Sequence, residues 1–226
     1  MISPCKSAER PAGRHDLVFV SPKGWRAMLE PHGELACDPL VLYWAELGWP
    51  TIRRRALPSE ATGLALGLPL PPSAGKKRLS FLAGRDDIIA VARPPSLRKA
   101  HASAPPCWRP TLDRLEELAL RHSTPARAFG SLAWQAMTGL DYVTASSDLD
   151  LLFETRPETD LDRLVADLAA IEIEAPMRLD GELMRADGAA VNWREFYAGA
   201  SELLVKSLDG VALLNRDQFI SGATGS

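Results

Sequence analysis

The sequence predicts an α/β protein of the α+β type, in which a mixed sheet with flanking helices follows a smaller N-terminal domain. Three observations lead to this prediction: helix and strand patterns alternate along the second half, short apolar runs fill the first half, and five prolines lie between residues 93 and 110. We therefore expect a small domain over residues 1–92, a Pro-rich linker over residues 93–110, and the main domain over residues 111–226.

The first half contains short apolar segments separated by Pro and Gly. Residues 15–20 precede Ser21-Pro22 and predict a first strand, and residues 24–29 predict a short helix. Further apolar runs cover residues 39–52, 64–70, 79–82 and 88–91. These lengths are typical of a small domain built from short strands.

The second half has clearer periodicity. In chain order it predicts a helix over residues 111–121, a strand ending at Gly130, an apolar helical segment over 132–137, a strand over 147–153, a helix capped by Thr159, a strand over 178–184 and a helix over 191–197. Asp209-Gly210 lies between the apolar runs 203–207 and 211–214, which predicts a terminal hairpin.

Composition excludes several classes of protein. The formal net charge of −3 argues against a general nucleic-acid binder. The chain has no run of about 18 apolar residues, and its first residues lack the apolar core of a signal peptide, so we expect no membrane partner. The three cysteines are an odd number without a CxxC pair, which favours a reducing, cytoplasmic location.

The segment 128–154 contains two pieces with chemical potential. Asp148 and Asp150 alternate with Leu149 and Leu151, so on a strand the two carboxylates project to one face. Earlier in the segment, Gly130-Ser131 lies between a short strand and an apolar helix. Such a turn offers unpaired backbone N–H groups and a favourable helix dipole to an anion.

The two pieces complement each other. Paired carboxylates in a cleft require a cation, and hard oxygen ligands with open positions suit Mg²⁺ (or Mn²⁺) shared with substrate phosphates. Asp148 and Asp150 are therefore the predicted metal ligands and catalytic carboxylates, and Gly130 and Ser131 the predicted phosphate contacts. The alternatives are a solvated strand face for the two acids and a plain N-cap role for Ser131.

A Gly-Ser turn followed by an Asp-x-Asp strand resembles the nucleotidyltransferase superfamily. The longer form here, GSLAWQAMTGL leading to SSDLDLL, resembles the phosphoribosyl-dephospho-CoA transferase of malonate decarboxylase, its holo-acyl-carrier-protein synthase. The likeness extends to RHDLV at residues 14–18, RLDGEL at 178–183 and LLVKS at 203–207. It implies a nucleotidyltransferase-like sheet, triphosphoribosyl-dephospho-CoA as donor and the acyl-carrier subunit as acceptor.

The resemblance to the superfamily also supports a third acid. Asp180 is that candidate for catalysis and metal binding, with Glu182 on the same face as the fallback and a turn role before Gly181 as the alternative. Lys206, on an otherwise apolar strand, and Arg127, just before the Gly-Ser turn, are candidate phosphate contacts. An edge-strand role for Lys206 and simple surface exposure of Arg127 are the alternatives.

Three functions remain open at this point. The first is the transferase implied by the resemblance, the second is another metal-dependent nucleotidyltransferase acting on a small molecule or protein, and the third is a non-catalytic module. Two basic clusters, residues 53–55 and 76–78, stand out in this acidic chain. We expect them to attract an acidic carrier, unless they are ordinary solvated surface.

Overall fold

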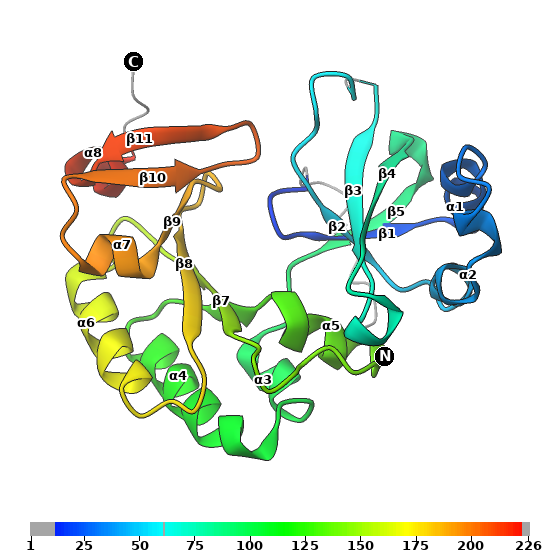
Figure 1. The fold of residues 1–226 in the computed structure, drawn as a ribbon. Helices are drawn as coiled ribbons and strands as arrows, with labels where there is room; N and C mark the ends of the chain where they lie inside the picture. Colours follow the sequence, from blue (N-terminus) through cyan, green and yellow to red (C-terminus); the bar gives the residue numbers. More distant parts are fainter. Residues whose placement is uncertain (1–11, 61, 223–226) are drawn as a thin grey trace. The chain divides into compact units, whose positions relative to one another are not determined.

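The computed structural model describes residues 12–60 and 62–222 of the 226-residue chain. The chain divides into two compact units, Met1–Pro94 and Pro95–Ser226 (Figure 1). Each unit has a sheet of its own, so each is described separately.

Unit 1 is built around a five-stranded antiparallel sheet of order β4-β3-β2-β1-β5. Its elements are β1 Leu17–Val20, α1 Pro22–Leu29, η1 Leu35–Cys37, α2 Pro39–Glu46, β2 Thr51–Arg53, β3 Leu64–Pro69, η2 Pro72–Ala74, β4 Arg78–Ala83, η3 Arg85–Asp87 and β5 Ile88–Ala92. The predicted short strands are confirmed, and residues 39–52 prove to be helix α2 followed by strand β2.

Aromatic side chains from the helices of unit 1 are buried in its core. Trp25 of α1 meets Phe81 of β4 edge to face, with ring centroids 6.0 Å apart. Trp44 of α2 is fully buried and its indole N–H donates to the carbonyl of Pro50 at 3.0 Å. Burial of these large rings gives the small unit its own core.

Unit 2 contains a six-stranded mixed sheet of order β11-β10-β9-β8-β7-β6, in which β7 and β8 are the parallel pair. Its elements are α3 Leu97–His101, η4 Pro106–Trp108, α4 Arg109–Arg121, β6 Ala126–Ala128, α5 Gly130–Thr138, β7 Leu149–Glu154, α6 Leu161–Glu172, β8 Leu179–Met184, β9 Ala190–Asn192, α7 Trp193–Tyr197, β10 Glu202–Lys206, β11 Val211–Asn215 and α8 Arg216–Ser221. The α+β class and the terminal hairpin are confirmed.

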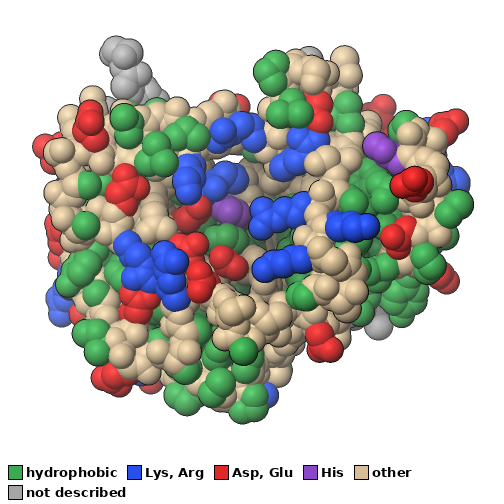
Figure 2. Space-filling view, in the orientation of Figure 1, with side chains coloured by type: hydrophobic (Ala, Val, Ile, Leu, Met, Phe, Trp, Pro, Cys, Tyr) green, Lys and Arg blue, Asp and Glu red, His purple; other side chains and the backbone are tan. Residues whose placement is uncertain are grey.

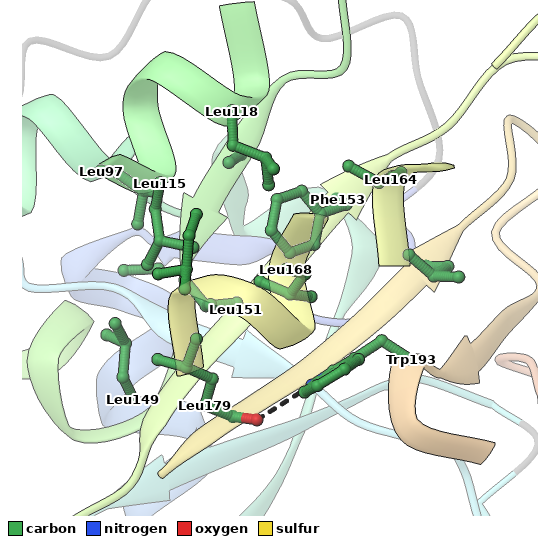
Figure 3. Packing of buried hydrophobic residues seen from close by; sticks show 14 of the residues in the cluster. Leu97, Leu115, Leu118, Leu149, Leu151, Phe153, Leu164, Leu168, Leu179 and Trp193 are labelled. Atoms are coloured by element: carbon green, nitrogen blue, oxygen red, sulfur yellow. Dashed lines mark hydrogen bonds between the residues drawn. The ribbon is translucent and has the colours of Figure 1, made fainter. Parts of the chain in front are cut away.

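One face of this sheet packs against helices. Leu149, Leu151 and Phe153 of β7 are fully buried, and Figure 3 shows them beside Leu115 and Leu118 of α4 and the leucines of α6. Helices α4 and α6 also contact each other, as Figure 1 shows. The opposite face of β7 and β8, which carries the acidic residues, is not part of this main core.

Two helix starts differ from the expectation. Asp160, not Thr159, caps α6, because its carboxylate accepts the N–H of Arg163 at 3.1 Å while the Thr159 hydroxyl accepts the N–H of Arg156. The expected helix over residues 191–197 begins as strand β9, and Asn192 caps the shorter α7. Locally, Val191 is compatible with a helix or with a strand. The pairing of this segment with β8 makes it a strand.

The five-proline stretch was expected to be a linker, but the structure shows helices in it. The boundary between the units falls at Pro94/Pro95, and α3, η4 and the first two residues of α4 lie within residues 93–110. Leu97 and Trp108 from this stretch belong to the main core of unit 2. Pro106 and Pro110 stand in the first turns of helices, where a missing N–H costs nothing, so these prolines start helices instead of breaking structure. No helix in the described part of the chain is long and apolar enough to cross a membrane.

Candidate active site

The register of the parallel pair β7–β8 places three acidic residues on one face of the sheet. Asp150 lies directly beside Asp180, and Leu152 beside Glu182. Since alternate residues on these strands enter the main core, Asp150, Asp180 and Glu182 face the other way. Asp150 and Asp180 are half-buried, whereas only 8% of Glu182 is exposed. Figure 2 shows acidic and basic side chains gathered over the strands of this unit.

Asp148 immediately precedes β7. Its side chain is 41% exposed, and its nearest cation is Arg178, whose Nη1 lies 3.8 Å from Oδ2 of Asp148. An ion pair this long and this exposed is weak. The Asp148 carboxylate therefore remains accessible to a ligand.

The Gly-Ser turn lies directly against Asp150. Strand β6 pairs with β7, and the N–H of Phe129 donates to the backbone carbonyl of Asp150 at 3.1 Å. Gly130 opens α5 with φ of +60°, and a Cβ at this position would lie 1.8 Å from Oδ2 of Asp150. Only glycine satisfies both the left-handed backbone and the contact with the carboxylate. The structure thus unites the two pieces that the sequence singled out.

Ser131 is the second residue of α5 and does not cap it. The N-cap is Phe129, which makes no side-chain capping bond, so the N-cap alternative for Ser131 is wrong. Within the described residues the Ser131 hydroxyl has no hydrogen-bond partner. This hydroxyl and the first N–H groups of α5 are donors positioned at the Gly-Ser turn.

Asp180 is held by a residue that the sequence analysis did not consider. The side-chain amide of Asn192 donates to Oδ1 of Asp180 at 2.9 Å, and its oxygen accepts the N–H of Arg194 at 2.9 Å. An Asn before a helical Trp-Arg-Glu segment is a recognisable N-cap signal. Its contact with Asp180 needs the pairing of β8 with β9.

Gln135 is a second residue that the sequence did not reveal. Its Oε1 accepts the N–H groups of Tyr142 and Val143 at 3.0 and 2.9 Å, and its Nε2 donates to the carbonyl of Ser103. These bonds tie the segment between α5 and β7 to the helix. They fix the chain that leads into Asp148.

Arg127 and Lys206 lie on the acidic face, and Lys206 is the more distant of the two from Asp150. Arg127 of β6 pairs with Leu152, and its Nε donates to Oε1 of Glu154 at 3.0 Å. Lys206 aligns with Ala190 and, through it, with Met184, four residues along β8 from Asp180. Four residues of strand span roughly 13 Å. The structure therefore places Lys206 away from Asp180, whereas Arg127 lies diagonally across from Asp150 on the neighbouring strand.

The residues present suit a hard cation such as Mg²⁺ in the chemistry of their donors. Mg²⁺ is commonly bound by one or two carboxylates together with substrate phosphates and water, and Asp148 and Asp150 supply two. Among the described residues, no three His, Cys, Asp or Glu side chains converge closely enough to form a complete metal cage. In the presence of substrate, phosphate oxygens and water would fill the remaining positions around an ion held by the two carboxylates.

Fold and site together define a class: an α+β protein with acidic residues beside a Gly-Ser turn. Two family models match the chain, the phosphoribosyl-dephospho-CoA transferase MdcG N-terminal domain over residues 13–94 and the corresponding C-terminal domain over residues 96–217. The chain belongs to the phosphoribosyl-dephospho-CoA transferase family. The two matches meet where the two structural units meet.

Individual relatives agree with the family assignment. A phosphoribosyl-dephospho-CoA transferase of Bradyrhizobium diazoefficiens is 70% identical over 226 residues, which is 100% of both chains. Another of the same name from Xanthomonas campestris pv. campestris is 38% identical over 91% of this chain and 95% of the relative. One from Pseudomonas putida is 37% identical over 74% of this chain and 79% of the relative. No solved structure matches the chain significantly.

Proposed function

We propose that the protein transfers phosphoribosyl-dephospho-CoA from its triphosphate donor, triphosphoribosyl-dephospho-CoA, to a serine of the acyl-carrier subunit of malonate decarboxylase, with release of pyrophosphate. The names of the relatives support the transferred group, and the resemblance of the sequence motifs supports the carrier and the donor. The cysteine pattern, with Cys37 and Cys107 as exposed free thiols, supports a cytoplasmic reaction.

The contact between Gly130 and Asp150 is the observation that carries this proposal. It sets a carboxylate directly against the start of α5, where backbone N–H groups and the Ser131 hydroxyl can hold an anion. The serine oxygen of the carrier forms a bond to the α-phosphorus of the donor while the bond to pyrophosphate breaks, and the hydroxyl proton passes to water. No covalent intermediate with the enzyme is required.

Asp148 and Asp150 would hold Mg²⁺ (or Mn²⁺) in this reaction, with Asp180 as the third acid on the same face. The cation, when bound, supplies neutralisation of the phosphate charge. Ser131 and the backbone N–H groups at the start of α5 would orient the triphosphate from the side opposite the cation. Lys206 would act on a more distant part of this long, multiply charged donor, and Arg127 on a part nearer Asp150.

The basic cluster 76–78 would attract the acidic carrier electrostatically. Lys76, Lys77 and Arg78 are all exposed. The other cluster serves the structure of unit 1: Arg54 binds both carboxylate oxygens of Glu60 and the carbonyl of Leu66, and Arg53 donates to the carbonyl of Ala65. Charge reversal at Lys77 therefore probes docking without breaking these bonds.

One experiment tests the proposal. The protein is incubated with Mg²⁺, triphosphoribosyl-dephospho-CoA and the carrier subunit, and the covalent gain in carrier mass and the release of pyrophosphate are measured. We expect transfer by the wild type and a loss of at least about a hundredfold in Asp150→Asn, since this variant removes a metal-binding charge. Asp209→Asn, the same change in the exposed turn of the β10–β11 hairpin, serves as the control.

The outcomes separate the alternatives. An active Asp150→Asn variant overturns the site, and a wild type that moves a different nucleotidyl group in a metal-dependent manner supports another nucleotidyltransferase. For the carrier, Lys77→Glu should raise the carrier KM at low ionic strength and have little effect at high salt, because steering by exposed charge is screened. An unchanged carrier KM at low salt would show that the cluster is ordinary surface.

A further inference from the structure

The corner between β9 and α7 fixes the side chain of Asn192 in one orientation. Its Oδ1 accepts the N–H of Arg194, so it caps α7. Its Nδ2 consequently points the other way and donates to Oδ1 of Asp180 at 2.9 Å. An amide turned by 180° would place oxygen against the carboxylate and nitrogen against an N–H group, so this hydrogen-bond pattern allows one orientation.

The strand that carries Asp180 is held by the same corner. The carbonyl of Leu179 accepts the indole N–H of Trp193 at 2.9 Å, drawn as a dashed line in Figure 3, and the guanidinium of Arg194 at 3.0 Å. The N–H of Leu179 donates to Glu172 at 2.9 Å. Both backbone polar groups of the residue before Asp180 are therefore fixed by α6 and α7.

The following residue is fixed as well. A Cβ at Gly181 would lie 2.9 Å from Cδ1 of Trp193, so the indole packs directly against the strand. Trp193 is 1% exposed. With both neighbours of Asp180 anchored, the remaining freedom of its carboxylate is rotation of the side chain, and the amide of Asn192 restrains that rotation.

The acidic surroundings of Asp180 favour a neutral hydrogen-bond donor, such as the amide of Asn192. Asp180 lies beside Asp150 in the parallel register, and Glu182 follows on the same face. Three acids on one face repel each other, and an amide stabilises a carboxylate without adding a positive charge that would compete for it with a metal ion. A lysine or arginine at residue 192 would neutralise the site instead.

We propose that Asn192 is a positioning residue that orients the Asp180 carboxylate toward a divalent cation and the donor triphosphate. This inference rests on the proposed function, since it assumes that Asp180 takes part in the metal-dependent transfer. Asn192 acts through Asp180 and does not contact the reacting atoms. Outer-shell partners of this kind usually contribute tenfold to hundredfold to metal affinity or activity.

The choice of substitution separates capping from positioning. Asn192→Ser keeps a good N-cap for α7 and removes the donor to Asp180, and Asn192→Asp keeps the cap but places a second negative charge against Asp180. Asn215→Ser is the matched control, because Asn215 caps α8 in the same manner, accepting the N–H of Gln218 at 2.8 Å. All three variants retain a helix-capping residue.

The first measurement is the rate of transfer as a function of Mg²⁺. We expect Asn192→Ser to lower kcat by about tenfold and to raise the Mg²⁺ concentration for half-maximal rate by a similar factor, with the donor KM little changed. Asn192→Asp should be slower still, and Asn215→Ser should match the wild type. Equal kcat and Mg²⁺ dependence in Asn192→Ser and Asn215→Ser would overturn the inference.

The second measurement does not depend on the reaction. Mn²⁺ binding to the protein alone is measured by calorimetry, and Asn192→Ser should bind about tenfold more weakly than the wild type and Asn215→Ser. If the wild type transfers nothing to the carrier, the proposed function fails while Mn²⁺ binding still decides the role of Asn192. Equal Mn²⁺ affinity in all proteins, or no binding to the wild type, would overturn the positioning role of Asn192.

Discussion

At the scale of single residues, Gly130 has two constraints that can be separated by experiment. Its φ of +60° and the approach of Asp150 both exclude a side chain, whereas Gly139 at the other end of α5 has φ of +73° and no atom within 4 Å of a Cβ. Gly139→Ala thus costs only the left-handed strain, roughly 1–2 kcal/mol. Gly130→Ala costs this strain and also displaces the Asp150 carboxylate.

We therefore predict different effects on activity from two substitutions with similar strain. Gly139→Ala should lower the free energy of unfolding by roughly 1–2 kcal/mol and leave transfer nearly intact. Gly130→Ala should be less stable than Gly139→Ala and should lose transfer activity, because Asp150 has to move. Urea unfolding and initial rates measure both quantities, and equal rates in the two variants would separate Asp150 from catalysis.

At the scale of elements, strand β8 is attached to α6 and α7 through Glu172. Burial raises the pKa of the Glu172 carboxyl, but hydrogen bonds from Arg194 and from the N–H of Leu179 outweigh burial, so the net shift of the pKa is downward. The folded protein thus binds this proton less readily than the unfolded chain. The resulting stability is present above the ordinary glutamate pKa of about 4.3 and is lost as the pH falls below it.

We predict that Glu172→Gln has a lower free energy of unfolding than the wild type at pH 7 and that the difference shrinks below about pH 4.3. The glutamine loses the charged interaction with Arg194 but has no proton to take up. Denaturant unfolding at several pH values between 3 and 7 measures the two curves. Parallel curves over this range would contradict the assigned role of Glu172.

At the scale of the whole molecule, the position of the boundary determines which fragment can fold. Residues 97–108 contribute Leu97, Ala100, Ala104 and Trp108 to the main core of unit 2, each no more than 5% exposed. A fragment that begins at residue 111 lacks these side chains, so the space that they fill in the core is empty. Loss of several large buried groups costs several kcal/mol, which is a large part of the stability of a domain.

We predict that a fragment of residues 95–226 folds cooperatively and that a fragment of residues 111–226 does not. Circular dichroism at 222 nm and thermal unfolding distinguish the two outcomes. Cooperative unfolding of the shorter fragment would show that α3 and η4 are dispensable, as expected of a linker. Failure of both fragments would show instead that unit 2 requires unit 1.

Much of the fold could be predicted because its signals are local. Alternation along residues 149–153 and 179–183 follows from the two-residue period of a strand with one buried face, and it also placed Asp150 and Asp180 on a polar side. The turn at Gly130-Ser131 was visible because this pair lies between a short apolar run and an apolar helical segment. The metal and phosphate roles of these residues stay predictions.

Other features depend on which segments become neighbours in space, and a local pattern does not contain this information. The prolines of residues 93–110 indicate a break locally, but in the structure Pro106 and Pro110 lie in the first turns of helices that bury Trp108 and Leu112. The distance of Lys206 from Asp180 follows from strand order and register.

The sequence by itself determined the α+β class, the family and the Asp148–Asp150 and Gly130 motifs, because each is expressed within a few consecutive residues or a single motif. The tertiary structure alone decided that Asp150 lies against Gly130 and that Asn192 holds Asp180. These contacts join residues 20 and 12 positions apart in the printed sequence. They exist because β6 and β7, and β8 and β9, pair through backbone hydrogen bonds that any sequence can form, so side-chain packing over the whole sheet selects them.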